Sequence, residues 1–291
     1  MVLTSAILIG VNRARGLPPL LRAENDARAL AKALMGPLGP IGPGNLRLLA
    51  GLDATRAGVA ATFRWVRGQS PENLLLMFAG HGDRDSLALA DAPLLHSELA
   101  QLIGEVGATR VVVLLDTCHA GAAATQFFMP QGLGAVPDLG WASAFARALP
   151  GVRLLVAARF NETASEAGSN GLFTGGFLEA LATLPGVDYG DAHYVTAEQA
   201  IRYTRDYVIE LTGGRQHPDA FGPVADFPLV RAGSLSLVPV ATQGLGLGKI
   251  IAGLAVGAAV VWGIGSAVSR LPRYDPSVGR KRGADGRFVP D

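Results

Sequence analysis

The sequence predicts an α/β fold: a mostly parallel, six-stranded sheet sandwiched by helices, followed by one C-terminal transmembrane helix. Three observations support this. Short runs that are apolar at almost every position alternate with segments whose apolar residues recur at helical spacing. Apolar residues make up 49% of the 291, enough for a sizeable core. A single stretch of 19 residues near the C-terminus carries no charge.

Six runs are predicted to be strands of the sheet. Five of them are apolar nearly throughout, as expected of strands that helices cover on both faces. The sixth is weaker and closes the folded region. In chain order, the runs are residues 5–11, 46–50, 73–79, 110–116, 152–158 and 227–230.

The segments between these strands are predicted to be helices. The first one, residues 23–35, places four apolar side chains on one face: Ala27, Leu30, Ala31 and Leu34. A breaker-rich loop, GPLGPIGPG at 36–44, follows it. Asp53 or Thr55 is expected to cap the next helix, because either side chain can accept a first-turn N–H. The remaining helices are expected at 56–67, 95–106, 141–149, 172–184 and 196–212.

The chain divides into a folded domain, a linker, an apolar segment and a tail. The domain is expected to span residues 1–232, and a Gly/Ser/Pro linker to span 233–248. Within 249–269, the uncharged residues 250–268 would form a helix of roughly 28 Å, about the thickness of a hydrocarbon core. A buried or partner-docking helix is the alternative. A basic, flexible tail is expected at 270–291.

Composition excludes several classes of protein. The single cysteine, Cys118, can form neither an internal disulfide nor a multi-cysteine zinc site. A net charge of +1 creates no overall positive potential that would attract nucleic acid, so no nucleic-acid partner is expected. The N-terminus lacks the basic region and cleavage site of a secretory signal.

A histidine and the cysteine each follow a predicted strand by two residues: His81 after 73–79, and Cys118 after 110–116. If the two strands are parallel neighbours, their carboxyl ends meet at one edge of the sheet and these two side chains lie close together. An imidazole can convert a thiol into a nucleophilic thiolate and later protonate a leaving amine. The backbone N–H groups of Gly82 and Cys118 would form an oxyanion hole.

These motifs resemble those of caspase-like cysteine peptidases. FAGHG at 78–82 and DTCHAG at 116–121 are similar to the family's two catalytic motifs. The opening AILIGVN with NDA at 25–27, GLFTGGFLEAL at 171–181 and RQHPDAFG at 215–222 also resemble family segments. The resemblance covers residues 1–231 and is closer to metacaspases and bacterial orthocaspases than to animal caspases. It implies a caspase–haemoglobinase fold with His81 and Cys118 as the catalytic dyad.

The resemblance also implies a substrate preference. In metacaspase-like enzymes, acidic residues that match Asp26 and Asp116 line the S1 pocket, which binds the side chain before the cleaved bond. Two carboxylates there would select Arg or Lys. The QAC-type signature of animal caspases is absent. On the alternative interpretation, Asp26 is an exposed carboxylate at a helix start and Asp116 a turn residue.

No metal or cofactor is expected, and calcium is the one candidate left open. Metacaspases often bind Ca²⁺ through an acidic cluster, whereas Asp83, Asp85 and Asp91 lack the dense spacing of a calcium loop. The other histidines show no metal-ligand spacing. We expect His96 and His193 at the surface, His217 in a loop, and His119 to orient its motif.

Together, these features predict a membrane-anchored cysteine endopeptidase that cleaves protein or peptide substrates after Arg or Lys. Two other classes stay open: a non-catalytic caspase-like scaffold, and a regulator fused to a membrane-active effector helix. The intact His81–Cys118 pair argues against the scaffold. Gly253 and Gly257 form a GxxxG step that would allow helix pairing and hence a homo-oligomer.

The orientation in the membrane rests on two opposed signals. The free thiol and the absent secretory signal favour a cytoplasmic peptidase domain on a single-pass anchor. Six basic residues in the tail favour the opposite orientation by the positive-inside rule. We expect the cytoplasmic orientation.

Overall fold

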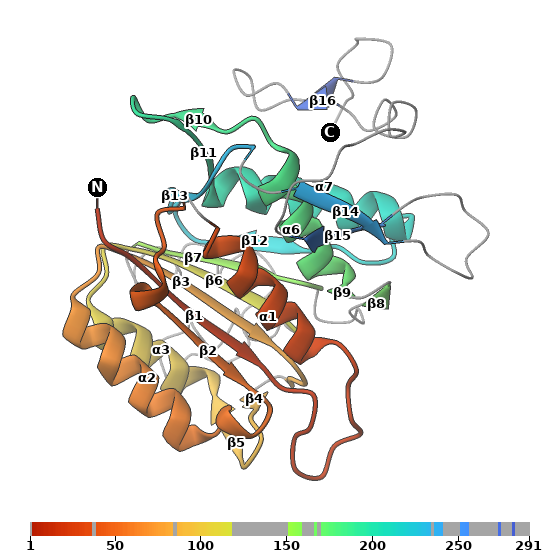
Figure 1. Cartoon of the computed structure of the whole chain (residues 1–291). Helices are drawn as coiled ribbons and strands as arrows, with labels where there is room; N and C mark the ends of the chain where they lie inside the picture. The colour runs from red at the N-terminus through yellow and green to blue at the C-terminus, as the bar shows by residue number, and fades with distance from the viewer. Residues whose placement is uncertain are drawn as a thin grey trace.

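A six-stranded sheet forms the centre of the molecule, with helices on both of its faces (Figure 1). The computed structural model describes residues 2–36, 39–83, 86–117, 151–158 and 170–233. It also describes the backbone of five short strands outside these ranges, at 166–167, 236–240, 251–255, 273–274 and 281–282.

Five strands of the sheet run parallel, and the sixth runs antiparallel at one edge. The order across the sheet is β12-β7-β6-β3-β1-β2. The parallel strands are β1 (Thr4–Gly10), β2 (Leu46–Ala50), β3 (Asn73–Ala79), β6 (Arg110–Asp116) and β7 (Val152–Val156). All five agree with the predicted strands to within two residues. β1 and β3 are buried at every position, as apolar runs covered on both faces must be.

The identity of the sixth strand was predicted wrongly. The edge strand is β12 (Asp219–Phe221), which pairs antiparallel with β7. The predicted run at 227–230 instead contributes to β13 (Pro228–Arg231) in a separate three-stranded sheet with β10 (Val187–Asp188) and β11 (His193–Thr196). β12 has three residues, too few for a periodic pattern, so only its pairing with β7 identifies it as a strand.

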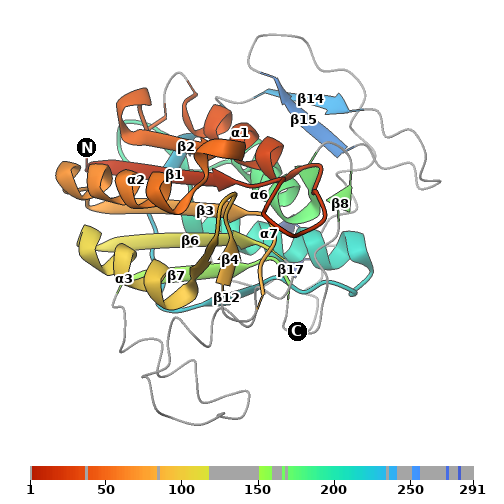
Figure 2. The same ribbon diagram turned by 90° about the horizontal axis from the view of Figure 1, so that it is seen from below.

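Two helix layers enclose the sheet. α1 (Ala23–Leu34), α6 (Leu172–Thr183) and α7 (Ala197–Thr212) pack on one face, and α2 (Arg56–Gln69) with α3 (His96–Val106) on the other. β1 shows the division directly, because Ala6 and Leu8 pack with the first layer and Ile7 and Ile9 with the second. Figure 2 looks onto the α2–α3 layer.

α2 begins where one of its two candidate capping residues predicts. Thr55, one of the two candidates, accepts a hydrogen bond from the Gly58 N–H at 3.0 Å and caps α2. Asp53 instead lies in the short 3-10 helix η2 (Gly51–Asp53). A second 3-10 helix, η1 (Pro43–Asn45), closes the loop that follows α1. The helix predicted at 141–149 lies outside the described residues.

Small hairpins complete the described chain: β4 (Ser86–Ala88) with β5 (Pro93–Leu95), β8 (Glu166–Ala167) with β9 (Asn170–Gly171), and β16 (Arg273–Tyr274) with β17 (Lys281–Arg282). In the predicted linker, β14 (Ser236–Val240) pairs antiparallel with β15 (Ile251–Ala255). β15 covers residues 251–255 of the predicted transmembrane helix, including Gly253. The rest of that segment, with Gly257, is outside the described residues.

Within the described ranges, every helix is too short or too polar to cross a bilayer. The membrane helix and the oligomer built on it stay predictions.

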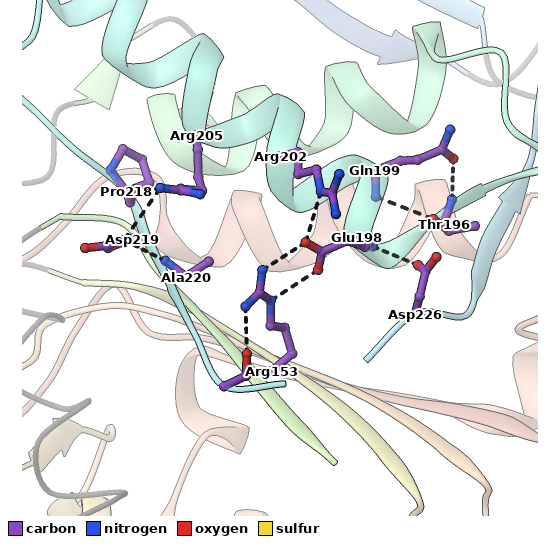
Figure 3. A network of polar contacts seen from close by, with 11 residues as sticks. Arg153, Thr196, Glu198, Gln199, Arg202, Arg205, Pro218, Asp219, Ala220 and Asp226 are labelled. Carbon is purple, nitrogen blue, oxygen red and sulfur yellow. Dashed lines mark hydrogen bonds and ion pairs between the residues drawn. The ribbon is translucent and has the colours of Figure 1, made fainter. Parts of the chain in front are cut away.

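A buried ion-pair network ties α7 to the edge of the sheet (Figure 3). Arg153 of β7 donates to both carboxylate oxygens of Glu198, in the first turn of α7, at 2.9 and 3.1 Å. A third nitrogen of Arg153 donates to the Gly222 carbonyl at 2.8 Å, just beyond β12. The Arg153 and Glu198 side chains are only 14% and 7% exposed. Arg202 adds a second partner for Glu198 at 3.1 Å.

We predict that Glu198→Ala destabilises the protein far more than Glu72→Ala. The first change leaves the Arg153 guanidinium buried without its carboxylate, which costs about 3–5 kcal/mol. Glu72 pairs with Arg110 at 2.7 Å, but both side chains are more than a third exposed. Such a pair contributes about 0–1 kcal/mol. Urea unfolding of both variants measures the difference, and equal losses would contradict it.

Candidate active site

The carboxyl ends of the parallel strands bring the predicted site residues to one edge of the sheet. β3 and β6 are neighbours, and their register pairs Ala79 with Asp116. His81 and Cys118 each lie two residues beyond this pair. The two strands are therefore adjacent and parallel, which is the arrangement on which the expected proximity of His81 and Cys118 depends. Cys118 itself lies outside the described residues, which reach Thr117 on this side.

The loops that follow β3 and β6 touch each other just before Cys118. The Gly80 N–H donates to the Asp116 carbonyl at 3.2 Å, which extends the pairing beyond the end of β3. A Cβ on Gly82 would lie 2.9 Å from Oγ1 of Thr117, a residue only 3% exposed. Only glycine at position 82 leaves room for this approach without moving Thr117.

Two backbone hydrogen bonds flank Gly82 and fix its loop. Gly82 forms an isolated antiparallel bridge with Leu87. The hydrogen bonds of this bridge join the Asp83 N–H to the Ser86 carbonyl at 3.0 Å and the Ala88 N–H to the His81 carbonyl at 2.9 Å. The bridge therefore holds the loop in place without using the Gly82 N–H, the group predicted to belong to the oxyanion hole.

A backbone carbonyl orients His81. Its Nε2 lies 2.7 Å from the carbonyl oxygen of Pro18, in the loop between β1 and α1 (dark red in Figure 2). A carbonyl only accepts hydrogen bonds, so Nε2 carries the proton. In the neutral imidazole, Nδ1 is then the basic nitrogen. Asn12 holds this loop: its carbonyl accepts the Leu20 N–H at 2.8 Å, and its side chain accepts the Glu24 N–H at 3.1 Å.

His96 is buried, so the expectation that it lies at the surface was wrong. It is 1% exposed as the first residue of α3, and its Nε2 lies 3.3 Å from the Asp83 carbonyl. The β4–β5 hairpin leads into α3 and folds this helix start against the His81 loop, a contact that the local sequence does not contain. His193 is exposed and His217 lies in a loop, as predicted, whereas His119 is outside the described residues.

Asp83 and Asp91 have local structural roles. The Asp83 carboxylate accepts the Ser86 N–H and hydroxyl at 2.7 and 3.1 Å, which stabilises the turn before β4. Asp91 accepts the Arg56 N–H at 3.0 Å, at the start of α2. Asp85 is outside the described residues. Across the described ranges, no group of three or more His, Cys, Asp or Glu side chains could hold a metal ion.

Asp26 is buried, in contrast to the alternative of an exposed helix-start carboxylate. It is 3% exposed. Its Oδ1 accepts the side-chain amide of Asn170 at 2.8 Å and the N–H of Gly171 at 3.1 Å. Burial of a carboxylate is costly unless it is hydrogen bonded, and these two donors supply that compensation.

Asp116 lies beside Asp26, and Gly171 lies between them. The Asp116 Oδ2 accepts the Thr174 hydroxyl at 2.6 Å. A Cβ on Gly171 would lie 3.1 Å from this Oδ2 and 3.4 Å from the Oδ2 of Asp26. The structure thus brings together the two carboxylates that the family resemblance assigns to one pocket, from α1 and from the end of β6.

Four residues that contact the site were missed. Pro18 contributes only a carbonyl, which leaves no signature in the side-chain pattern. Asn170, Gly171 and Thr174 lie at or beside GLFTGGFLEAL, a segment that resembles the family but for which no site residue was expected. The glycine and threonine of that motif, at the start of a helix, were the available signal.

Comparisons with known proteins identify the fold. The profile of the caspase domain, peptidase family C14, matches residues 4–221. The chain belongs to this family. Among solved structures, this caspase domain is similar to the crystal structure of a protein from Geobacter sulfurreducens, with 19% sequence identity and a TM-score of 0.50. The alignment covers 76% of this chain and 94% of that chain, and at this identity it supports the fold alone. A comparison with curated proteins found no match.

We predict that Gly82→Ala slows the alkylation of Cys118 by iodoacetamide. The added methyl group would push Thr117 away, and a displacement near 1 Å in a catalytic loop can cost about 100-fold in reactivity. Cys118 is the only cysteine, so the label reports on this site alone. Gly68→Ala in α2, where a Cβ meets nothing within 4 Å, is the control. Equal rates in the two variants would refute the contact.

Proposed function

We propose that this caspase domain is an active cysteine endopeptidase, with Cys118 as the nucleophile and His81 as its base. The observation that carries the proposal is the register of β3 and β6, which starts both catalytic loops from one pair of residues, Ala79 and Asp116. The hydrogen bond from His81 to Pro18 supports it, because that bond leaves Nδ1 as the basic nitrogen.

The mechanism proceeds by acyl transfer. His81 Nδ1 takes the proton of the Cys118 thiol, and the thiolate attacks the peptide carbonyl carbon. The oxyanion accepts hydrogen bonds from the N–H groups of Gly82 and Cys118, each of the kind that contributes about 10²–10³-fold to the rate. Collapse of this intermediate breaks the C–N bond as His81 protonates the leaving amine. Water, deprotonated by His81, then hydrolyses the thioester and regenerates the thiol.

We predict that Cys118→Ala and His81→Ala each abolish peptide hydrolysis while the folded structure persists. His81 is partly exposed and Cys118→Ala removes a single sulfur atom, so thermal unfolding of both variants should resemble that of the wild type. His193→Ala, at an exposed position of β11, is the control and should keep full activity. Full activity of Cys118→Ala would exclude the mechanism. A folded wild type that hydrolyses no peptide and does not react with electrophilic peptides would favour the scaffold.

We further propose that substrates carry Arg or Lys before the cleaved bond. The proximity of Asp26 and Asp116 around Gly171 supports this preference, because two carboxylates attract a cation and repel an acidic side chain. Asp116 is the more accessible of the two, since it is partly exposed whereas Asp26 is buried.

We predict that Asp116→Asn lowers kcat/KM for Arg substrates by about 10- to 150-fold and leaves neutral substrates nearly unchanged. This range corresponds to the loss of one charge-assisted hydrogen bond of about 1.5–3 kcal/mol. Asp53→Asn removes the same charge from an exposed position of η2 and serves as the control. A wild-type preference for Asp before the cleaved bond would contradict the assignment.

A further inference from the structure

The start of α6 holds both carboxylates of the proposed S1 pocket. Gly171 is the N-cap residue of α6, and its N–H donates to Asp26. Thr174, in the first turn, donates to Asp116, and Asn170 donates to Asp26 from β9. Three neighbouring residues of one segment therefore hydrogen bond to two carboxylates that come from distant parts of the chain.

The start of α6 offsets the repulsion between the two carboxylates. Two carboxylates around one glycine repel each other, and this repulsion disfavours the state in which both are charged. The first turn of a helix carries a partial positive charge, and hydrogen bonds to a carboxylate favour its charged form. The start of α6 supplies both effects, and the N–H of Gly171 is one of the helix donors that needs an acceptor.

The geometry also restricts where the carboxylate oxygens point. The Thr174 hydroxyl is 2.6 Å from the Asp116 Oδ2, a short bond to a group that is only partly exposed. Gly171 has no side chain, and a Cβ there would lie 3.1 Å from the Asp116 Oδ2 and 3.4 Å from the Asp26 Oδ2, so the two carboxylates close tightly around this glycine. A methyl group there would press on both carboxylates.

We propose that Asn170 and Thr174 are positioning residues for substrate specificity, and that Gly171, which has no side chain, lets the two carboxylates lie close enough together to bind one guanidinium or ammonium group. This inference rests on the proposed function for its substrate class. The residues act through Asp26 and Asp116, so their loss should weaken selection of a basic side chain while the chemistry at Cys118 continues.

The test measures binding of agmatine, a guanidinium compound without a peptide bond, to protein carrying Cys118→Ala. Isothermal titration calorimetry in this background is independent of catalysis. We expect Thr174→Val to weaken agmatine binding about 10-fold, because Asp116 loses the donor that fixes its orientation and favours its charged form. Thr174→Ser, which keeps the hydroxyl, should restore it.

Two matched controls on the same helix separate positioning from stability. Thr183→Val removes a hydroxyl that donates to the Glu179 carbonyl at the far end of α6. Gly175→Ala adds a methyl group where a Cβ meets nothing within 4 Å. Both should bind agmatine like the parent protein, whereas Gly171→Ala should bind it at least 10-fold more weakly. Equal binding by Thr174→Val and Thr183→Val, or no binding by the parent, would overturn the inference.

Turnover by the same variants with Cys118 intact completes the test. For Arg substrates, Thr174→Val should raise KM about 10-fold with kcat nearly unchanged, and neutral substrates should be cleaved as by the wild type. A fall in kcat for all substrates would indicate a merely structural role and overturn the inference. Agmatine binding that depends on Thr174, in a protein that cleaves no peptide, would refute the peptidase proposal and leave the cation pocket standing.

Discussion

β3 and β6 run parallel and in register from Asn73 and Arg110 to Ala79 and Asp116, and the candidate site depends on this pairing. Because the two strands end level, the loops that carry His81 and Cys118 start side by side. The contact between Gly82 and Thr117 shows that the loops stay together for at least one further residue. A shift in register would separate the pair, since each residue of a strand advances about 3.3 Å.

Backbone groups orient His81 and hold its loop. The Pro18 carbonyl selects the protonated nitrogen of the imidazole, and the bridge between Gly82 and Leu87 holds the loop without using the Gly82 N–H. A backbone group is positioned by the fold and loses little freedom when it makes a contact. This explains why a short loop flanked by glycines can hold a histidine in one orientation.

A chain of contacts connects the edge of the sheet to the two carboxylates. Arg153 and Glu198 tie α7 to β7 in a nearly dry environment (Figure 3). Phe177 of α6 and Ile201 of α7 belong to the same core cluster, so α6 is placed against α7 and the sheet. The start of α6 then reaches Asp26 and Asp116. Asp26 and Asp116 are thus positioned by the start of a helix whose other residues pack in the core.

The sequence by itself determined the parallel strands and most of the helices, and it singled out His81 and Cys118 as candidates. Apolar runs such as 73–79 and the helical spacing after them are local patterns. The positions of His81 and Cys118, two residues beyond a strand end, can be counted directly in the sequence. The proximity of Asp26 and Asp116 was implied by the family resemblance, and the described contacts agree with it.

Only the tertiary structure decided β12, the burial of His96, the Pro18 contact and the hydrogen bonds of Asn170 and Thr174. Each of these joins segments that are distant in the chain or involves a backbone group, and hydrophobic periodicity carries no information about either. The edge strand illustrates the reason best. Three residues contain no period, so the free energy that makes them a strand comes from pairing with β7 and from the Arg153 bond to Gly222 beside them.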